Sequence, residues 1–194
     1  MFSRLKQTHW KLQATGGFSL IEMVIVILAI GIFGSLAATM LANGATIYAE
    51  TMEKKRFIAQ ARSSYWRLNR ETGLQQKKSN YINSTQNMVN IATATGKTVQ
   101  ATLTGETNLN LSISGSSHLL SNTTLNDSSR FSYLTDQFNE ISIPAGQSLT
   151  QSQSQNVHLM QIDIKYQSSG ATIRFKSFVF PQNVRFGQEM PYHE

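Results

Sequence analysis

Cysteine is absent from this sequence of 194 residues, which excludes disulfide bonds and the thiolate ligands of most structural zinc sites. Histidine could still bind a metal, but none of the four histidines has a second candidate ligand at the spacing of a metal site. They fall in the N-terminal segment (His9), a polar loop (His118), a strand (His158) and the C-terminus (His193). We therefore expect neither a metal site nor a cofactor.

Catalytic motifs are missing as well. The sequence has no motif of an activated nucleophile and no glycine-rich loop of the kind that binds phosphate. Asp136 and Glu140 lie four residues apart, but two surface acids at this spacing are far more often solvated than catalytic. We expect that the protein is not an enzyme.

Proline is scarce, and none of the three prolines precedes Pro144, so no proline interrupts the apolar run Met23–Ala42. Every residue of this run is apolar or small, and Ser35 and Thr39 carry its only hydroxyls. Its 20 residues are about the number that an α-helix needs to cross roughly 30 Å of hydrocarbon. The run predicts a single transmembrane helix.

Acidic residues are absent from residues 1–17, which carry Arg4, Lys6 and Lys11. The positive-inside rule then predicts a cytoplasmic N-terminus, with the bulk of the chain on the other side of the membrane. An ordinary secretory signal has its small-residue cleavage site after the apolar stretch, whereas here Gly16-Gly17 comes before it. A cut at this point would remove only the charged leader and leave the apolar helix on the mature protein.

The segment Gly17-Phe18-Ser19-Leu20-Ile21-Glu22, set directly against the apolar run, resembles the processing and assembly signal of type IV pilins and of the pseudopilins of type II secretion systems. The resemblance implies that a prepilin peptidase cleaves after Gly17 and that the new N-terminal residue, Phe18, is methylated. Glycine before the cut fits this chemistry, because a side chain there would crowd the peptidase site and glycine lets the chain extend.

Glu22 is a carboxylate at the edge of an apolar helix, where it costs on the order of a few kcal/mol unless it is paired or near the headgroups. It could simply lie at interface depth in the first turn, where the helix dipole favours negative charge. Alternatively, as the fifth residue from Phe18, it could neutralise the new amine of a neighbouring subunit and set the register between subunits. The matching glutamate has this role in the resembled family, whose tip class typically lacks it, so Glu22 argues against that class.

Residues 43–73 continue the helical pattern beyond the apolar run, with Ile58, Ala61, Tyr65 and Leu68 on one face. Asn43-Gly44 is a weak spot rather than a break, and Gly73 is a plausible C-terminal cap. Residues 50–71 carry six basic side chains against three acidic ones. This basic face is predicted to lie in solvent or against anionic lipid, or to contact other pilins.

From residue 74 onward the chain is rich in Ser, Thr, Asn and Gln. Alternation predicts a strand over Thr107–Ser114 and a hairpin of Val157–Tyr166 with Ala171–Phe180. In the second arm of the hairpin Ile173, Phe175 and Phe178 are grouped together, interleaved with Arg174, Lys176 and Ser177. The polar segment Gly146–Asn156 is predicted to be a loop. The eight basic and seven acidic side chains of this region nearly balance, which does not support nucleic-acid binding. We predict an α+β, pilin-like fold in which a long N-terminal helix, half transmembrane and half amphipathic, packs against a C-terminal antiparallel β-sheet head.

The predicted domains are a leader that is removed (1–17), a transmembrane and assembly helix (18–42), its amphipathic continuation (43–73) and a β-rich head (74–194). Residues Ala59–Glu71 resemble minor pilins of the mannose-sensitive haemagglutinin group and one class of minor pseudopilin. Many major pilins carry a C-terminal disulfide loop, so the lack of cysteine favours a minor subunit.

The function predicted first is a minor type IV pilin-like subunit that assembles into or initiates a filament through its N-terminal helix. A minor pseudopilin of a type II secretion system and an unrelated single-span periplasmic binding domain remain as alternatives. Expected partners are other pilin or pseudopilin subunits, the prepilin peptidase and N-methyltransferase, an inner-membrane assembly platform and lipid, but no nucleic acid. The expected location is the bacterial inner membrane, with a periplasmic head that could enter an extracellular pilus.

Overall fold

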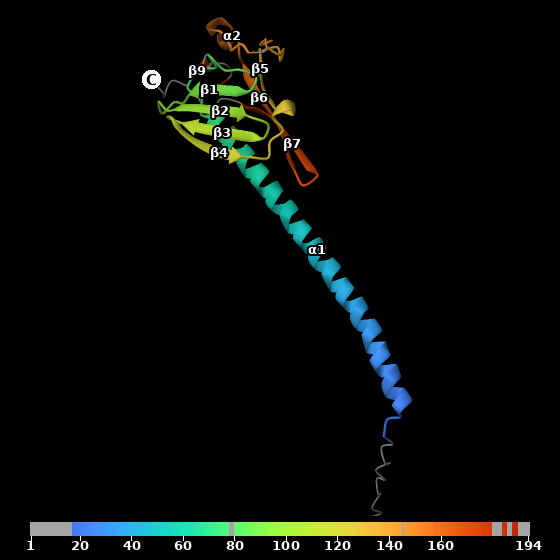
Figure 1. The fold of residues 1–194 in the computed structure, drawn as a ribbon. Helices are drawn as coiled ribbons and strands as arrows, with labels where there is room; N and C mark the ends of the chain where they lie inside the picture. Colours follow the sequence, from blue (N-terminus) through green and yellow to red (C-terminus); the bar gives the residue numbers. More distant parts are fainter. Residues whose placement is uncertain (1–16, 78–79, 145, 180–183, 186–187, 190–194) are drawn as a thin grey trace, which may run out of the picture. The chain divides into compact units, whose positions relative to one another are not determined.

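The structure is a computed structural model that describes residues 17–77, 80–144, 146–179, 184–185 and 188–189. The chain divides into two compact units, Met1–Glu50 and Thr51–Glu194, each of which is described by itself. Helix α1 (Leu20–Gly73) is the one element that belongs to both (Figure 1). Of the predicted leader, residues 1–16 lie outside the described residues.

The part of α1 in the first unit is helical without interruption from Leu20 to Glu50. Helix continues through Gly31, Gly34 and Asn43-Gly44, because each glycine costs only about 1 kcal/mol of helix propensity and no proline is present. This confirms the prediction that Asn43-Gly44 does not end the helix, and α1 ends at Gly73 as predicted.

The second unit contains a four-stranded antiparallel sheet in sequential order, formed by β1 (Met88–Ala92), β2 (Thr98–Thr104), β3 (Asn108–Ile113) and β4 (Ser116–Ser121). Alternate side chains of β1 to β3 are buried. Val89, Ala101 and Leu111 are paired in register across these strands and are completely buried, so one face of the sheet belongs to the core. β3 confirms the strand predicted over Thr107–Ser114.

A second, three-stranded antiparallel sheet has the order β5-β6-β7 and consists of β5 (Arg130–Leu134), β6 (Leu159–Ser168) and β7 (Ala171–Val179). β6 and β7 form the predicted hairpin, and its turn is Ser169-Gly170, where both residues have positive φ. The end of the predicted second arm, Phe180, lies outside the described residues. The remaining elements are η1 (Asn126–Ser128), α2 (Gln151–Gln155) and a short pair, β8 (Val184–Arg185) with β9 (Gln188–Glu189).

The prediction for the second arm of the hairpin was wrong at Phe178, which the sequence pattern grouped with Ile173 and Phe175. Strict alternation along β7 places Phe178 on the opposite face, with Arg174 and Lys176. Its side chain is 54% exposed there.

The second-unit part of α1 packs on the core through one stripe of side chains. The buried residues are Phe57, Ala61, Ser64, Tyr65, Leu68, Thr72 and Gly73. The predicted face was correct at Ala61, Tyr65 and Leu68 but wrong at Ile58, which is 40% exposed while its neighbour Phe57 is buried. Phe57 lies four residues before Ala61 and therefore continues the same stripe, whereas Ile58 is rotated away from it.

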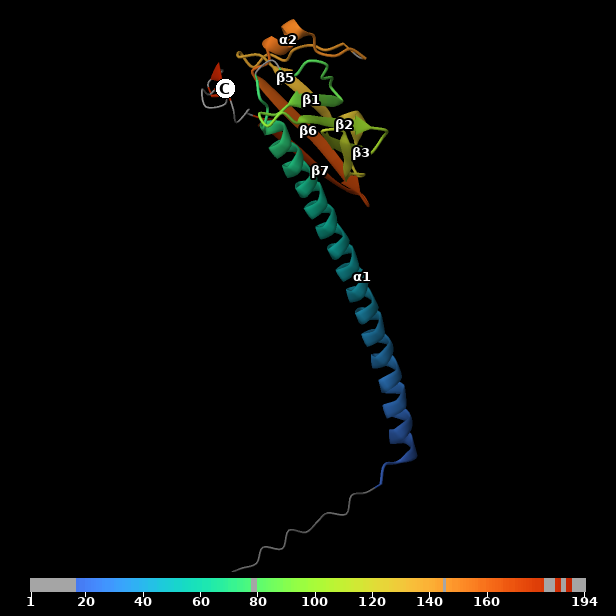
Figure 2. The same cartoon turned by 90° about the vertical axis from the view of Figure 1, so that its left-hand side faces the viewer.

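Hydrogen bonds and ring contacts join this stripe to the hairpin, and β6 and β7 run beside α1 in Figure 2. Ser64 Oγ lies 3.0 Å from the Tyr166 hydroxyl, and the Tyr65 hydroxyl donates to Ser177 Oγ at 2.7 Å. The Tyr65 ring also stacks on Phe175, with ring centroids 5.1 Å apart. Polar groups that would be costly inside a core are therefore paired with each other.

The polar segment Gly146–Asn156, predicted to be a loop, contains the short helix α2. Thr150 caps this helix: its side chain accepts from the backbone N–H of Gln153, while the Gln153 side chain accepts from the backbone N–H of Thr150. This reciprocal capping box, Thr-x-x-Gln, is a known start signal for a helix.

The fold is α+β in a pilin-like arrangement: a long N-terminal apolar helix whose second-unit part packs against antiparallel sheets. The predicted fold class is confirmed.

Candidate assembly and processing site

Ser19 caps the N-terminus of α1. Its side-chain oxygen accepts a hydrogen bond from the backbone N–H of Glu22 at 3.3 Å, and its carbonyl oxygen accepts from Met23 at 3.2 Å. Glu22 is therefore the third helical residue, in the first turn, where the positive end of the helix dipole favours a carboxylate. This geometry agrees with the interpretation that the helix dipole stabilises the Glu22 carboxylate in the first turn. Glu22 is also exposed, as pairing with the amine of a neighbouring subunit would require.

Gly17 and Phe18 precede this cap and lie outside the helix. The Phe18 side chain is 73% exposed, and a Cβ atom added to Gly17 would meet no atom within 4 Å. Nothing within the described part of the chain therefore requires glycine at position 17. A glycine at this position would instead fit a binding site on another molecule that has no room for a side chain.

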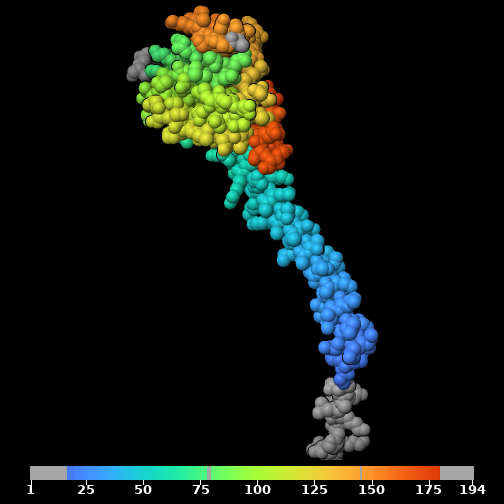
Figure 3. Space-filling model, viewed as in Figure 1, coloured from blue at the N-terminus to red at the C-terminus, as the bar shows by residue number. Residues whose placement is uncertain are grey.

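The apolar run that follows is exposed along its whole length. None of the best 18-residue window of α1 is buried, and large apolar side chains stand open from Leu20 to Leu41. Figure 3 shows the side chains of this segment, coloured blue, on the face in view. The helix is long and apolar enough to cross a membrane.

Three hydroxyls in the first-unit part of α1 bond to the backbone of the helix itself. Ser35 Oγ donates to the carbonyl of Ile32 at 2.8 Å, and Thr39 Oγ1 donates to the carbonyl of Ser35 at 2.9 Å. Thr46 Oγ1 makes the same kind of bond to Ala42. A hydroxyl satisfied within its own helix does not need water, so these residues are compatible with a lipid environment.

The basic face of α1 in the second unit is exposed at Arg62, Arg67 and Arg70. Arg70 forms an ion pair of 2.7 Å with the adjacent Glu71. Glu53 accepts a hydrogen bond of 2.7 Å from Ser169 at the tip of the β6–β7 turn.

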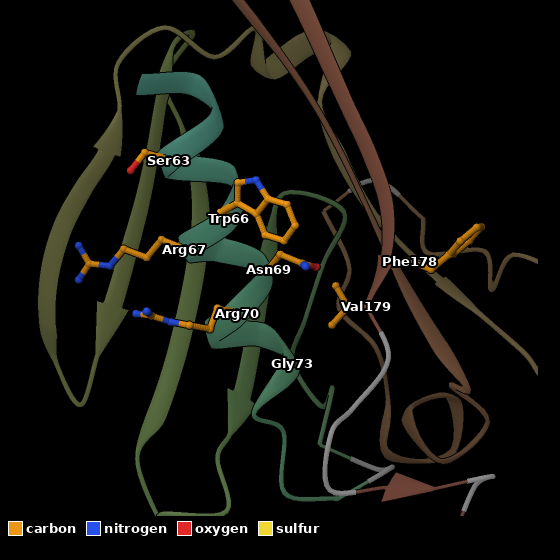
Figure 4. Close-up of a pocket in the computed structure, with 8 residues that line it drawn as sticks. All are labelled: Ser63, Trp66, Arg67, Asn69, Arg70, Gly73, Phe178 and Val179. Atoms are coloured by element: carbon orange, nitrogen blue, oxygen red, sulfur yellow. The ribbon is translucent and has the colours of Figure 1, made fainter. Parts of the chain in front are cut away.

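A groove of about 600 Å³ lies in the second unit between α1 and the end of β7 (Figure 4). In Figure 4 the Trp66 ring stands on the helix side of the groove, the carboxamide of Asn69 extends from the helix toward Val179 at the end of β7, and the Phe178 ring points away from the helix. Arg67 and Arg70 add positive charge. Sequence reasoning missed this groove because it joins residues of α1 and β7 that lie more than a hundred positions apart.

A second hollow, of about 650 Å³, is polar and lies over the outer face of the three-stranded sheet. Arg130, Lys165 and Arg174 line it. Arg174 is bound by both oxygens of the buried Asp163, at 2.7 and 2.6 Å, and Arg130 lies 3.7 Å from Glu140. Since two of the three cations already face carboxylates, their charge stabilises the sheet and does not define an anion site.

Four tyrosines are buried in the core: Tyr65, Tyr81, Tyr133 and Tyr166. Burial raises the pKa of each hydroxyl, to about 12 for Tyr166. Tyr166 bonds to Ser64, and Tyr133 donates to the carbonyl of Thr85 at 3.1 Å. The hydroxyls of Tyr65, Tyr133 and Tyr166 are hydrogen-bonded within the core, whereas the buried Tyr81 hydroxyl has no hydrogen-bond partner among the described residues. None of the four tyrosines lines either hollow.

Among the described residues no group of three or more metal-binding side chains occurs. His118 lies in the exposed strand β4, not in the predicted loop, and His158 lies immediately before β6, not within a strand. His9 and His193 are outside the described residues. Asp136 is exposed, and Glu140 accepts a hydrogen bond from Ser132 at 2.8 Å.

No protein-family model, curated protein or solved structure matches this chain.

Proposed function

We propose that this protein is a minor type IV pilin-like subunit, cut after Gly17 and assembled into a filament through α1. The observation that carries the proposal is the order of features at the start of the chain. An open Gly17-Phe18 precedes a capped helix with Glu22 in its first turn, and an uncovered apolar helix follows. An apolar helix of this length needs either lipid or neighbouring helices around it.

The chemistry of assembly follows from the cut. Hydrolysis after Gly17 would create a positively charged amine on Phe18, which stays positively charged when methylated. In lipid, that amine and the Glu22 carboxylate of a neighbouring subunit would each cost on the order of a few kcal/mol if left alone. Their pairing removes much of this cost only at one axial offset between two parallel helices. The pair would therefore set the register of the filament.

Small residues support close packing of such helices. Gly31 with Ser35, and Gly34 with Ala38, are spaced four residues apart on one helix. A Cβ at Gly31 or Gly34 would meet no atom of the described chain within 4 Å. The glycines are therefore available for contact between subunits.

The partners that follow are other pilin-like subunits, a prepilin peptidase with its methyltransferase activity, an assembly platform and lipid. The three basic residues of the leader favour a cytoplasmic N-terminus. The lack of cysteine favours a minor subunit over a major one, and Glu22 favours a position other than the tip.

The test separates cleavage from assembly. Glu22→Gln should be processed and inserted normally, since the peptidase reads the leader and the glycine, but should be depleted about tenfold or more from sheared filaments. Glu50→Gln is the matched control, because it removes a carboxylate from the same helix beyond the apolar run. Equal incorporation of both variants would overturn the register role. In a deletion strain, loss of filaments rather than of protein secretion identifies a pilus subunit.

A further inference from the structure

The turn after β5 presents a phenylalanine in a strained conformation. Phe138 has φ of +61° and its side chain is 63% exposed. A bulky residue in the left-handed region costs on the order of 1–2 kcal/mol, and it persists only when the surrounding structure holds it there. Phe138 does not have the conformational freedom of glycine at positive φ, and its exposed side chain gains little from burial. Neither factor therefore offsets the conformational cost.

Backbone hydrogen bonds hold the turn firmly. Thr135 donates to the carbonyl of Asn139 at 2.9 Å, and Phe138 donates to the carbonyl of Thr135 at 3.0 Å. Ile141 then donates to the carbonyl of Tyr133 at 2.8 Å, which ties the returning chain to β5. The aromatic ring is therefore presented by a rigid turn, which reduces the entropy lost on binding.

The turn also carries a carboxylate without a partner. Asp136 is exposed, and within the described residues no ion pair or hydrogen bond involves its side chain. A surface complementary to this turn would have an apolar site for the aromatic ring and a cation beside it for the carboxylate. The groove between α1 and β7 has this composition, with the Trp66 ring on its helix side and Arg67 beside it.

Arg67 is available for such a pair. It is exposed, and among the described residues it makes no ion pair, whereas its neighbour Arg70 is bound to Glu71. The groove, at about 600 Å³, has room for a phenylalanine ring and part of the turn that carries it. Trp66, 63% exposed, is the kind of residue that dominates binding energy in such contacts.

We infer that the turn of residues 135–139 docks into the α1–β7 groove of a second copy of this chain, with Phe138 packed on the exposed ring of Trp66 and Asp136 paired with Arg67. Turn and groove are different surfaces of one molecule, so the contact is heterologous. Repeated, it extends into a ring or a helical filament rather than closing as a two-fold dimer. This contact between second units adds to assembly through α1 and does not depend on cleavage after Gly17.

The absence of cysteine allows a direct test with the full-length chain in detergent. Two single-cysteine variants, Gln137→Cys at the turn and Ser63→Cys at the groove, are mixed and treated with a short bismaleimide. The mixture should give a covalent dimer at several times the yield of either variant alone. Ser117→Cys, on the exposed strand β4, is the control for Ser63→Cys and should give only background.

Substitutions in this cross-linking background test the contacts. Phe138→Ala should lower the yield to the background of either single variant, because it removes a dominant contact, whereas Leu119→Ala, also an exposed apolar residue, should not. Asp136→Arg and Arg67→Asp should each lower it, and together they should restore it, which a general folding defect cannot do. Asp127→Arg and Arg62→Asp are the matched charge controls.

Three results would overturn the inference. The first is equal cross-linking to Ser63→Cys and Ser117→Cys, and the second is a charge swap that fails to restore the yield. The third is capture by Gln137→Cys of a different protein, and not of a second copy, when the reaction is repeated in native membranes.

Discussion

Ser19 Oγ lies 3.3 Å from the backbone nitrogen of Glu22, so the serine caps the helix in whose first turn the glutamate lies. The residue that begins α1 thus also fixes where the proposed assembly carboxylate stands relative to Phe18. A shift in the start of the helix would move Glu22 along the helix axis, and with it the register that the pairing with a neighbouring amine would set.

Ser19→Ala should loosen the first turn of α1. Loss of an N-cap costs about 0.5–2 kcal/mol, so the amide of Glu22 should exchange with solvent several times faster. Hydrogen exchange followed by mass spectrometry in detergent micelles measures this. Ser19→Thr, which keeps a capping hydroxyl, is the control, and indistinguishable exchange in the two variants would show that the cap contributes nothing.

Phe57→Ala should destabilise the second unit far more than Ile58→Ala. Phe57 is 5% exposed and Ile58 is 40% exposed, although the sequence pattern favours Ile58 as the core residue. Truncation of a buried phenylalanine costs about 3–5 kcal/mol, whereas truncation of a half-exposed isoleucine costs about 1 kcal/mol. Urea unfolding followed by tryptophan fluorescence compares the two, and similar midpoints would contradict the position of the helix stripe.

Arg174→Ala should destabilise the sheet, because it leaves the buried carboxylate of Asp163 without its bidentate partner. Arg174→Lys should recover only part of this, since an ammonium cannot bind both oxygens in the same geometry. Lys176, which pairs with Asp163 in register but forms no ion pair with it in the described chain, gives the control Lys176→Ala. If the midpoints of Arg174→Ala and Lys176→Ala coincide, the buried pair is not stabilising.

Alkaline pH should unfold the second unit through its buried tyrosines. In the folded chain burial raises the pKa of Tyr166 from 10.0 to about 12. Below pH 10 the hydroxyl is neutral in both states and the full stability is present. As the pH rises from 10 through about 12, the unfolded state ionises first and stability is lost.

Tyr166→Phe has no proton to lose at this position. Its stability should therefore fall less between pH 10 and 12, by on the order of 2 kcal/mol, at a cost near neutral pH of about 1 kcal/mol for the lost bond to Ser64. Circular dichroism during urea unfolding at several pH values measures the difference. If the wild-type protein and Tyr166→Phe lost stability equally between pH 10 and 12, ionisation of Tyr166 would not be the cause of the alkaline unfolding.

Much of the fold could be predicted because its signals are local. The apolar run, the absence of proline and the alternation in β3 and in the β6–β7 hairpin depend on neighbours in sequence. The errors occurred where tertiary packing decides between adjacent residues, as for Phe57 against Ile58 and for Phe178. Helix α2 was missed for a different reason, because the capping box Thr150–Gln153 was present in the sequence and was not considered.

In the candidate site, too, the residues that are close in sequence could be predicted and those brought together by the fold could not. Gly17, Phe18 and Glu22 could be identified because they form one contiguous motif, and Ser19 could have been added from the pattern Ser-x-x-Glu. The groove of Trp66 and Phe178 could not be found from sequence, because it joins residues more than a hundred positions apart. The strained Phe138 also had no sequence signal, since a positive φ at phenylalanine is imposed by the turn that holds it.

The most direct test of the account is the N-terminal residue of the mature protein isolated from its native membrane, measured by mass spectrometry of the terminal fragment. The account predicts a chain that begins with N-methylated Phe18, and a Gly17→Trp variant that keeps residues 1–17. A wild-type chain that begins at Met1 would contradict it.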